Sequence, residues 1–271
     1  MIQRKYSGEE KPLKKVLSEL FPELSYSELQ SCLRKKDVKI DGVRASSDSF
    51  LRQGAVVTVY PKKKREIKVI FEDENLLACY KPKGIASEGE ISFESIVREE
   101  KGDVRLMHRL DTNTDGVLLF TKNQMAYQEV FVAMKEGRIV KTYTAEVYGH
   151  PPAGKEVALD YFYKKDAEKG RALISDREKS GFVPVHISFH VIKQKEESSV
   201  VSVLLHKGKM HQIRAMLAFY GCFILGDGKY GSDEVNRRLG VSKTALTASA
   251  LSFELPPNSP LAYLNTIKIA L

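Results

Sequence analysis

The sequence has little cysteine and no long apolar run. Its three cysteines, Cys32, Cys79 and Cys222, are far apart and odd in number, which argues against a disulfide framework and against a zinc knuckle. No segment approaches the length needed to cross a bilayer, and the charged N-terminus is not followed by the apolar stretch of a signal peptide. We therefore expect a cytoplasmic protein that does not contact membranes.

Several catalytic signatures are also missing. The sequence has no GxSxG elbow and no HExxH pair, and the glycine-rich GDGKYG at 226–231 lacks the spacing of a Walker loop or a dinucleotide fingerprint. His186 and His190 are four residues apart, but HISFH alternates as a strand does. These patterns do not support a serine hydrolase, a metal-dependent hydrolase or a nucleotide cofactor.

Positive charge is distributed unevenly along the chain. The net charge is +8, and residues 1–68 hold 16 Lys and Arg against 9 Asp and Glu. The rest of the chain is nearly balanced, with 27 against 26. A solvated basic face would explain such a surplus, but its confinement to one short segment favours a polyanionic partner, either nucleic acid or an anionic surface.

The basic segment carries the pattern of a small domain. Apolar residues recur at helical spacing from Leu13 to Phe21, and Ser25 followed by Glu28 indicates a capping box that begins a second helix. The exposed end of that helix is the basic run Arg34, Lys35 and Lys36.

A small β element completes the segment. Asp41-Gly42 is a strong hairpin signal, and GAVVTVY at 54–60 is typical of a strand. We therefore expect a domain over residues 1–60, marginal in size but able to fold alone. PKKKRE at 61–66 is the expected linker.

Strand patterns dominate residues 67–271. Strands are expected at 67–71, 76–80, 117–121, 140–148, 157–163, 183–191 and 200–205, and helices at 92–100, 124–135 and 210–220, where Gly221 is a natural stop. Because strands outnumber helices and short turns join many of them, the predicted fold class is α+β. We expect a mixed, mostly antiparallel sheet with flanking helices, preceded by the small α/β domain.

MHRLDTNTDGVLLFTKN at 107–123 places polar side chains directly before an apolar run. Asn113 and Gly116 are turn formers, and the run that follows suits a strand buried on both faces. Asp111 is therefore expected on a loop at the edge of a rigid sheet, where a carboxylate can be held in place. A local ion pair between Arg109 and Asp111 is an alternative interpretation.

Two further stretches could carry function. KTYTAEV at 141–147 alternates, so Lys141 and Tyr143 share one face of a strand, although a tyrosine there is more often a packing residue. HKGKMHQIR at 206–214 crowds basic groups at the start of a helix, which suits either a phosphate site or a basic helix cap.

Together these stretches resemble the RluA family of pseudouridine synthases. HRLDTNTDGVLLFTKN resembles the family's HRLD signature, and four more segments follow the family's order: VIFEDENLLACYKPKGI, KTYTAEVYG, GKMHQIRAMLAFYGCFILGDGKYG and TASALSFELP. The resemblance covers residues 67–271 and marks them as the catalytic domain. Residues 1–60 resemble the ribosomal-protein-type RNA-binding domain often fused ahead of it.

The resemblance implies roles for individual residues. Asp111 matches the family's catalytic aspartate, Tyr143 its active-site tyrosine, and Arg214 the arginine that pairs with the aspartate. Arg109 matches an arginine implicated in opening the RNA, where a stacked base must be extruded at some cost. Further RNA contacts are expected from His108, Lys209, His211, Arg34, Lys35 and Lys36.

The implied reaction breaks the bond between ribose and the uracil nitrogen, turns the base and rejoins it through carbon. It needs an ionised carboxylate and no energy input, so neither a metal nor another cofactor is expected. The implied substrate is structured RNA, large-subunit ribosomal RNA before tRNA, and we expect a monomer. The rival hypothesis is a non-catalytic RNA-binding or ribosome-assembly protein that retains the synthase fold.

The sequence departs from the family pattern at a few positions. Asp115 stands where Ser is common, and Lys209 with Met210 replaces the usual Arg-Thr. Met216 and Thr247 each stand where the family commonly has His. Since Asp111, Tyr143 and Arg214 are intact, we expect activity, and we expect the departures to face the RNA and to bear on target choice.

Overall fold

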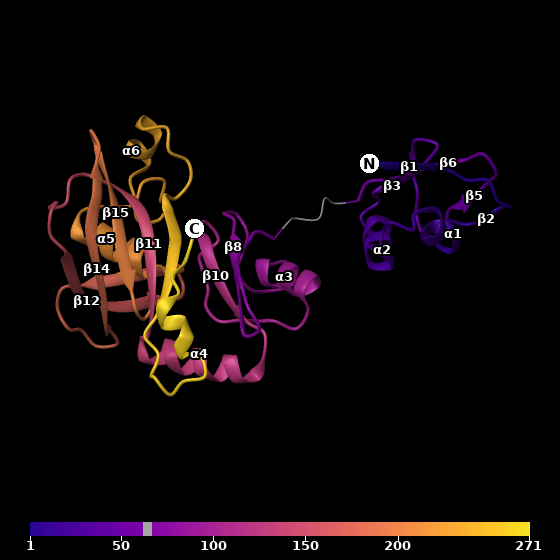
Figure 1. Ribbon diagram of the computed structural model, residues 1–271. Coiled ribbons are helices and arrows are strands. Elements are labelled where there is room, and N and C mark those ends of the chain that lie inside the picture. Colours follow the sequence, from indigo (N-terminus) through magenta and orange to yellow (C-terminus); the bar gives the residue numbers. More distant parts are fainter. Residues whose placement is uncertain (62–66) are drawn as a thin grey trace. The chain divides into compact units, whose positions relative to one another are not determined.

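The computed structural model describes residues 1–61 and 67–271, and the chain divides into two compact units, Met1–Glu66 and Ile67–Leu271 (Figure 1). Each unit has an apolar core of its own. Apart from Pro61, the predicted linker at 61–66 lies outside the described residues. The roles assigned to the two domains stay predictions at this point.

Two helices and two small antiparallel sheets make up the first unit. The helices are α1 (Leu13–Leu20) and α2 (Tyr26–Arg34). One sheet has the order β1-β6-β3-β4, from Ile2–Lys5, Val56–Val59, Val38–Ile40 and Val43–Arg44, and the other pairs β2 (Lys11–Pro12) with β5 (Phe50–Leu51). The sequence did not predict β1.

The local signals in this unit are confirmed. Ser25 and Glu28 form the predicted capping box, in which each side chain accepts a hydrogen bond from the other residue's backbone N–H. Asp41 and Gly42 have φ angles of 48° and 84°, the two positive values that a tight hairpin turn between right-twisted strands requires.

An eleven-stranded sheet forms the second unit, in the order β13-β12-β14-β15-β11-β16-β10-β8-β7, with β9 on β10 and β17 on β16. The strands are β7 (Val69–Glu72), β8 (Leu76–Lys81), β9 (Arg105–Leu106), β10 (Asp115–Thr121), β11 (Ile139–Tyr148), β12 (Val157–Asp166), β13 (Arg171–Ser175), β14 (Val183–Gln194), β15 (Ser198–Leu205), β16 (Leu246–Phe253) and β17 (Ile269–Ala270). Among these described strands only the β10–β16 ladder is parallel. The predicted α+β class with a mostly antiparallel sheet is confirmed.

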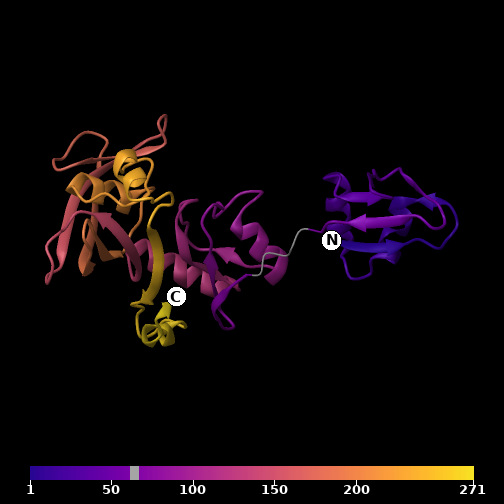
Figure 2. The same ribbon diagram turned by 90° about the horizontal axis from the view of Figure 1, so that it is seen from above.

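Helices cover both faces of this sheet (Figures 1 and 2). They are α3 (Phe93–Lys101), α4 (Gln124–Glu136), α5 (Gln212–Tyr220), α6 (Asp233–Arg238) and the 3₁₀ helix η1 (Ala262–Thr266). One apolar cluster includes residues of α3 and α5, and another includes residues of α4 and η1. Along β10, Leu118 belongs to the first cluster and Leu119 to the second, so this strand is buried on both faces as predicted.

Element ends differ from the sequence prediction by a few residues. The helix expected at 210–220 begins at Gln212, and the strand expected to end at 163 continues to Asp166. The sequence did not predict β13 or α6. None of the helices in the described parts of the chain is long and apolar enough to cross a bilayer.

A single row of residues links β10, β16 and β11. Ala248 on β16 pairs with Gly116 on one side and with Tyr143 on the other. Gly116 has a φ of 122°, and a Cβ atom at this position would overlap the Ala248 backbone, so only glycine fits. This close approach holds the loop before β10, which carries Asp111, beside the strand that carries Tyr143.

Candidate active site

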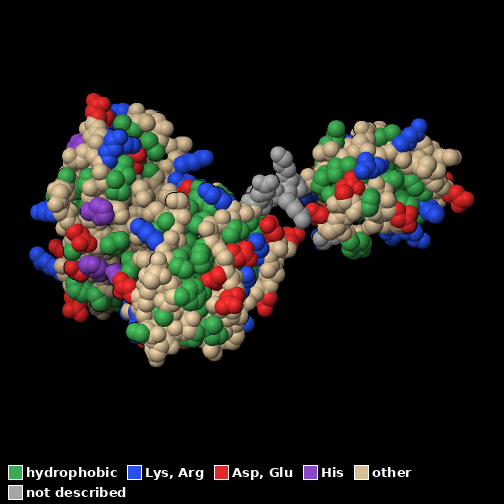
Figure 3. All heavy atoms as spheres, in the orientation of Figure 1, with side chains coloured by type: hydrophobic (Ala, Val, Ile, Leu, Met, Phe, Trp, Pro, Cys, Tyr) green, Lys and Arg blue, Asp and Glu red, His purple; other side chains and the backbone are tan. Residues whose placement is uncertain are grey.

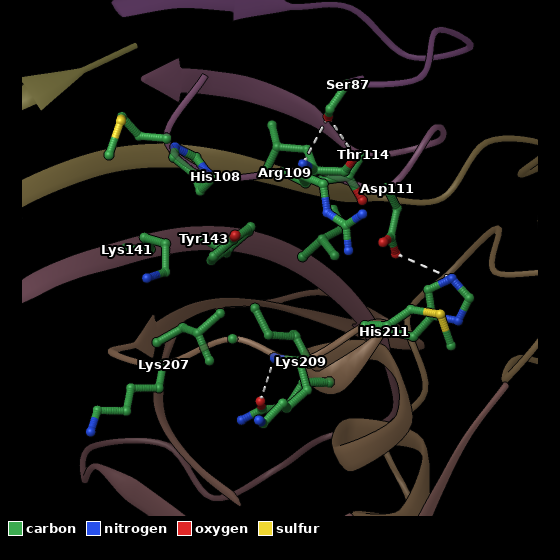
Figure 4. A pocket seen from close by; sticks show the side chains of 18 of the residues that line it. Ser87, His108, Arg109, Asp111, Thr114, Lys141, Tyr143, Lys207, Lys209 and His211 are labelled. Carbon is green, nitrogen blue, oxygen red and sulfur yellow. Dashed lines mark hydrogen bonds and ion pairs between the residues drawn. The ribbon is translucent and has the colours of Figure 1, made fainter. Parts of the chain in front are cut away.

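A pocket of about 940 Å³ lies at this row of residues in the second unit (Figure 4). Its walls come from the loop before β10, from β11 and from the loop that leads into α5. The structure brings together here seven of the predicted site residues: His108, Arg109, Asp111, Tyr143, Lys209, His211 and Arg214. The other three, Arg34, Lys35 and Lys36, are exposed at the end of α2 in the first unit.

Arg214 joins two carboxylates in the wall of the pocket. Its Nη1 donates to Asp111 Oδ2 at 2.8 Å, while Nε and Nη2 donate to the two oxygens of Asp227 at 2.7 and 2.8 Å. Asp227 is fully buried, whereas the Asp111 side chain is 26% exposed. The bidentate pair fixes the guanidinium plane, so that one N–H is aimed at the accessible carboxylate.

Asp227 is a site residue that the sequence analysis missed. It lies in GDGKYG, where Gly226 has a φ of 73° and has no room for a Cβ against the Lys243 carbonyl. Backbone N–H groups of Lys229 and Tyr230 also donate to Asp227. Burial raises the pKa of Asp227, but the hydrogen bonds and charge of Arg214 outweigh it and hold the pKa below its usual value. The sequence signal that could have identified Asp227 was the position of an acidic residue inside a glycine-rich turn.

Tyr143 and Lys141 point from β11 toward the same pocket, as their alternation predicts (Figure 4). Between the Thr142–Ala250 and Tyr143–Ala248 pairs the ladder skips Ser249, so β16 carries a bulge beside the site. Burial, with the nearby Asp111 charge, raises the pKa of Tyr143 above its usual value, so its phenol is neutral. Burial lowers the pKa of Lys141 to about 8, and its Nζ donates to the His206 carbonyl at 2.7 Å.

Two of the three histidines that line the pocket, His108 and His211, are held by different contacts. His211 begins α5 in a left-handed conformation, with Nε2 at 3.7 Å from Asp111 Oδ2 and Nδ1 at 3.1 Å from the Tyr230 hydroxyl. His108 Nε2 accepts a hydrogen bond from the Leu119 N–H. Burial lowers the pKa of His108 to about 3, so its ring is neutral.

Arg109 does not pair with Asp111. Its Nη1 forms an ion pair with Glu88, and the side chain is 64% exposed. The alternative of a local Arg109–Asp111 pair is therefore wrong, because the guanidinium at Asp111 comes from Arg214, far away in the sequence.

The departures from the family pattern do not all face the pocket opening. Met216 is fully buried in the apolar cluster on the α5 side, so the expectation that it faces the RNA is wrong. Asp115 and Thr247 contact each other, since the Thr247 hydroxyl donates to Asp115 Oδ1 at 2.7 Å, and the Tyr80 hydroxyl donates to Oδ2 at 2.7 Å. The two substitutions form one hydrogen-bonded unit where β10 begins. Lys209 is exposed at the pocket.

Among residues 1–61 and 67–271, no cluster of three His, Cys, Asp or Glu side chains has the arrangement of a metal site. The three cysteines are buried and free. The pocket presents carboxylates, a fixed guanidinium, a neutral phenol, imidazoles and amines.

Solved structures with this fold are pseudouridylate synthases. The human RNA pseudouridylate synthase domain containing 1 protein aligns with a TM-score of 0.64 at 19% identity, over 79% of this chain and 86% of that one. The human domain containing 4 protein aligns with a TM-score of 0.56 at 22% identity, over 70% and 89%. The fold is thus that of the pseudouridylate synthases.

Sequence comparison agrees with the fold. The family described as RNA pseudouridylate synthase matches residues 75–219, more than half of the chain. Ribosomal large subunit pseudouridine synthase C of Rickettsia conorii is 28% identical over 253 residues, 82% of this chain and 83% of that one. The protein of the same name from Pasteurella multocida is 28% identical over 260 residues, 86% and 79%.

The chain belongs to the RNA pseudouridylate synthase family, and the resemblance to its RluA-type members is confirmed. It is an RNA pseudouridine synthase, an isomerase whose substrate is RNA. The non-catalytic alternative is not supported.

Proposed function

We propose that this protein converts uridine to pseudouridine in large-subunit ribosomal RNA, with Asp111 as the catalytic carboxylate. The observation that carries the proposal is the ion pair from Arg214 to a partly exposed Asp111, in a pocket shared with the buried Tyr143. The names of the relatives support the choice of RNA, since both refer to the ribosomal large subunit. A tRNA-directed synthase is the second candidate.

Asp111 is the proposed nucleophile or base toward the target nucleoside. Among the described side chains, the hydrogen bond from Arg214 and the 3.7 Å contact with His211 both involve its Oδ2, which leaves Oδ1 for the substrate. The fixed guanidinium stabilises negative charge on the carboxylate. The ion pair with Asp227 fixes the Arg214 guanidinium, and with it the N–H group that donates to Asp111. The Asp111 carboxylate is therefore oriented before RNA binds.

Tyr143 is the proposed partner of the uracil ring. A neutral phenol can stack on a base and can donate or accept a proton through its hydroxyl. The raised pKa of Tyr143 keeps that proton in place at neutral pH.

Positive side chains at the rim are the proposed phosphate contacts. Lys135, Lys207 and Lys209 line the pocket and are accessible. Arg109 would brace the RNA where the base is extruded, after exchanging Glu88 for a phosphate or a base edge. Arg34, Lys35 and Lys36 would add contacts from the first unit. A cytoplasmic location and a monomeric state stay predictions.

The proposal is tested by incubating the purified protein with transcripts of large-subunit ribosomal RNA and, separately, with bulk tRNA, and then mapping pseudouridine. We expect new pseudouridine at one or a few sites of the ribosomal RNA, without added metal. Modification confined to tRNA would move the function to the second candidate, and no modification of either RNA would contradict the proposal.

Asp227→Asn is expected to lower the turnover number by about 10- to 100-fold with little change in RNA affinity. The amide NH₂ would face the guanidinium, which would turn and lose its alignment on Asp111. The substitution also leaves a buried Arg214 charge poorly paired, at a cost of about 3–5 kcal/mol in the free energy of unfolding.

Single-turnover rates, RNA affinity and urea unfolding would be measured for Asp227→Asn and for Glu197→Gln. Glu197 forms an exposed ion pair with Arg238. Its substitution should therefore leave the single-turnover rate, the RNA affinity and the free energy of unfolding unchanged. If Asp227→Asn lost stability but kept the parent turnover number at a temperature where it is folded, Asp227 would serve only the fold.

A further inference from the structure

A second pocket of about 620 Å³ lies next to the catalytic one. The segment His206–Lys209 and Gln212 line both pockets, so the loop before α5 is the wall between them. The far side of the second pocket is built by β12 and β14, and none of the residues assigned to the reaction above comes from these strands.

Phe162 and Pro184 are two of the apolar residues that line this pocket, together with Tyr161, Val183 and Val185. Phe162 and Pro184 are direct partners in the ladder between β12 and β14, so their side chains leave the same face of the sheet. Two residues away on each strand, Asp160 and His186 are also partners, and the His186 ring is 2.8 Å from the Asp160 carboxylate. The Phe162 ring and Pro184 thus form an apolar surface that is bordered by hydrogen-bonding groups.

The shared wall supplies the cationic part. Lys207 and Lys209 are exposed, and in Figure 4 the Lys207 side chain extends away from Asp111 and Tyr143. The wall itself is tied to β14, because Gln212 donates to the His186 carbonyl at 3.0 Å and accepts from the Lys209 N–H at 2.9 Å. A flat apolar surface beside amines suits a nucleobase with its phosphate.

We propose that this second pocket binds a nucleotide neighbouring the target uridine on the same RNA strand. The base lies against Phe162 and Pro184, and the phosphate that links it to the target crosses the wall at Lys207 and Lys209. The proposal rests on the proposed function, since the strand must enter the first pocket at Asp111. It adds a part of the protein that reads a flanking base, and therefore a determinant of target choice outside the catalytic pocket.

A double-mutant cycle between protein and RNA tests the proposal. The RNA is a short oligonucleotide around a uridine that the wild-type protein modifies. One version has all its normal bases. Each of the other versions has a single abasic site, at one of the two positions on the 5′ side or one of the two positions on the 3′ side of the target. The proteins are the wild type, Phe162→Ala, Phe162→Tyr and Leu173→Ala. Leu173 is a matched control, because it is 42% exposed on β13 and lines neither pocket.

We expect Phe162→Ala to lower kcat/KM on the normal RNA by about tenfold, the size of one lost stacking contact. Phe162→Tyr and Leu173→Ala should have the same kcat/KM as the wild type. One abasic position should lower the wild-type value by a similar factor and leave the Phe162→Ala value unchanged. The second-pocket proposal would be overturned if the loss of kcat/KM caused by Phe162→Ala and the loss caused by an abasic site multiplied at every position. It would also be overturned if Phe162→Ala had the kinetics of the wild type. Turnover by the wild type reports on the proposed function separately.

Discussion

Asp111→Asn is expected to abolish pseudouridine formation in a protein that still folds and still binds RNA. The amide has nearly the same shape, and its oxygen can still accept the hydrogen bond from Arg214. It lacks the charge and the nucleophilicity that the reaction needs, so the rate should fall by at least about 10³-fold.

Stability should be nearly unchanged in this variant. Arg214 keeps its bidentate pair with the buried Asp227, so removing the charge of Asp111 leaves no buried charge without a partner. Single-turnover rates from nucleoside chromatography of digested RNA, RNA affinity and urea unfolding would be compared with Asp103→Asn, which changes an exposed aspartate of the same unit. Turnover by Asp111→Asn within tenfold of the wild type would disprove the assignment.

Removing residues 1–66 is expected to weaken RNA binding at low salt and to flatten its salt dependence. Residues 1–66 hold 15 Lys and Arg against 9 Asp and Glu, six of the eight net positive charges, and each phosphate contact contributes about 0.7–0.9 to the slope of log affinity against log salt. The slope should therefore fall by several units. Residues 67–271 form a separate compact unit with its own core, so the truncated protein should keep its reaction on a short RNA at high concentration.

The measurement is RNA affinity across a salt series for the full chain, the truncated chain, and a full chain in which Arg34, Lys35 and Lys36 are changed to Gln. On the face shown in Figure 3, basic side chains of the first unit lie in several places and not in one continuous patch. The triple variant should therefore account for only part of the change in slope. If truncation left the slope unchanged, the basic segment would be a solvated face without a role in binding.

Local signals explain how much of this molecule could be predicted from its sequence. The capping box at Ser25 and the hairpin at Asp41-Gly42 are encoded within a few residues, and both are present in the structure. The alternation at Lys141 and Tyr143 and the apolar run after Asp111 likewise placed those side chains on the correct elements.

Contacts between distant segments are not encoded in local sequence patterns. Asp227 was missed because its importance depends on α5 bringing Arg214 to the GDGKYG turn. Met216 was predicted to face the RNA because the family commonly has a polar His at this position. In the structure, Met216 lies on the buried side of α5 and is completely inaccessible to solvent. The choice of Glu88 as the partner of Arg109 also depends on tertiary structure. Motif order indicated the family, and only the three-dimensional fold gave the pairings.

Arg214 is shared between two aspartates, so these three side chains together carry one unit of net negative charge, while Lys135, Lys207 and Lys209 at the rim of the pocket are positive. In the proposed function, this difference in charge would repel a phosphate from the carboxylates and hold it at the rim, so that the uncharged part of a nucleotide, its ribose and base, enters the pocket. Breaking the bond between ribose and base leaves the sugar electron-poor, and an excess of negative charge beneath the ring stabilises that state. Under the proposed function, the same three side chains would therefore sort the substrate by polarity and favour the departure of its base.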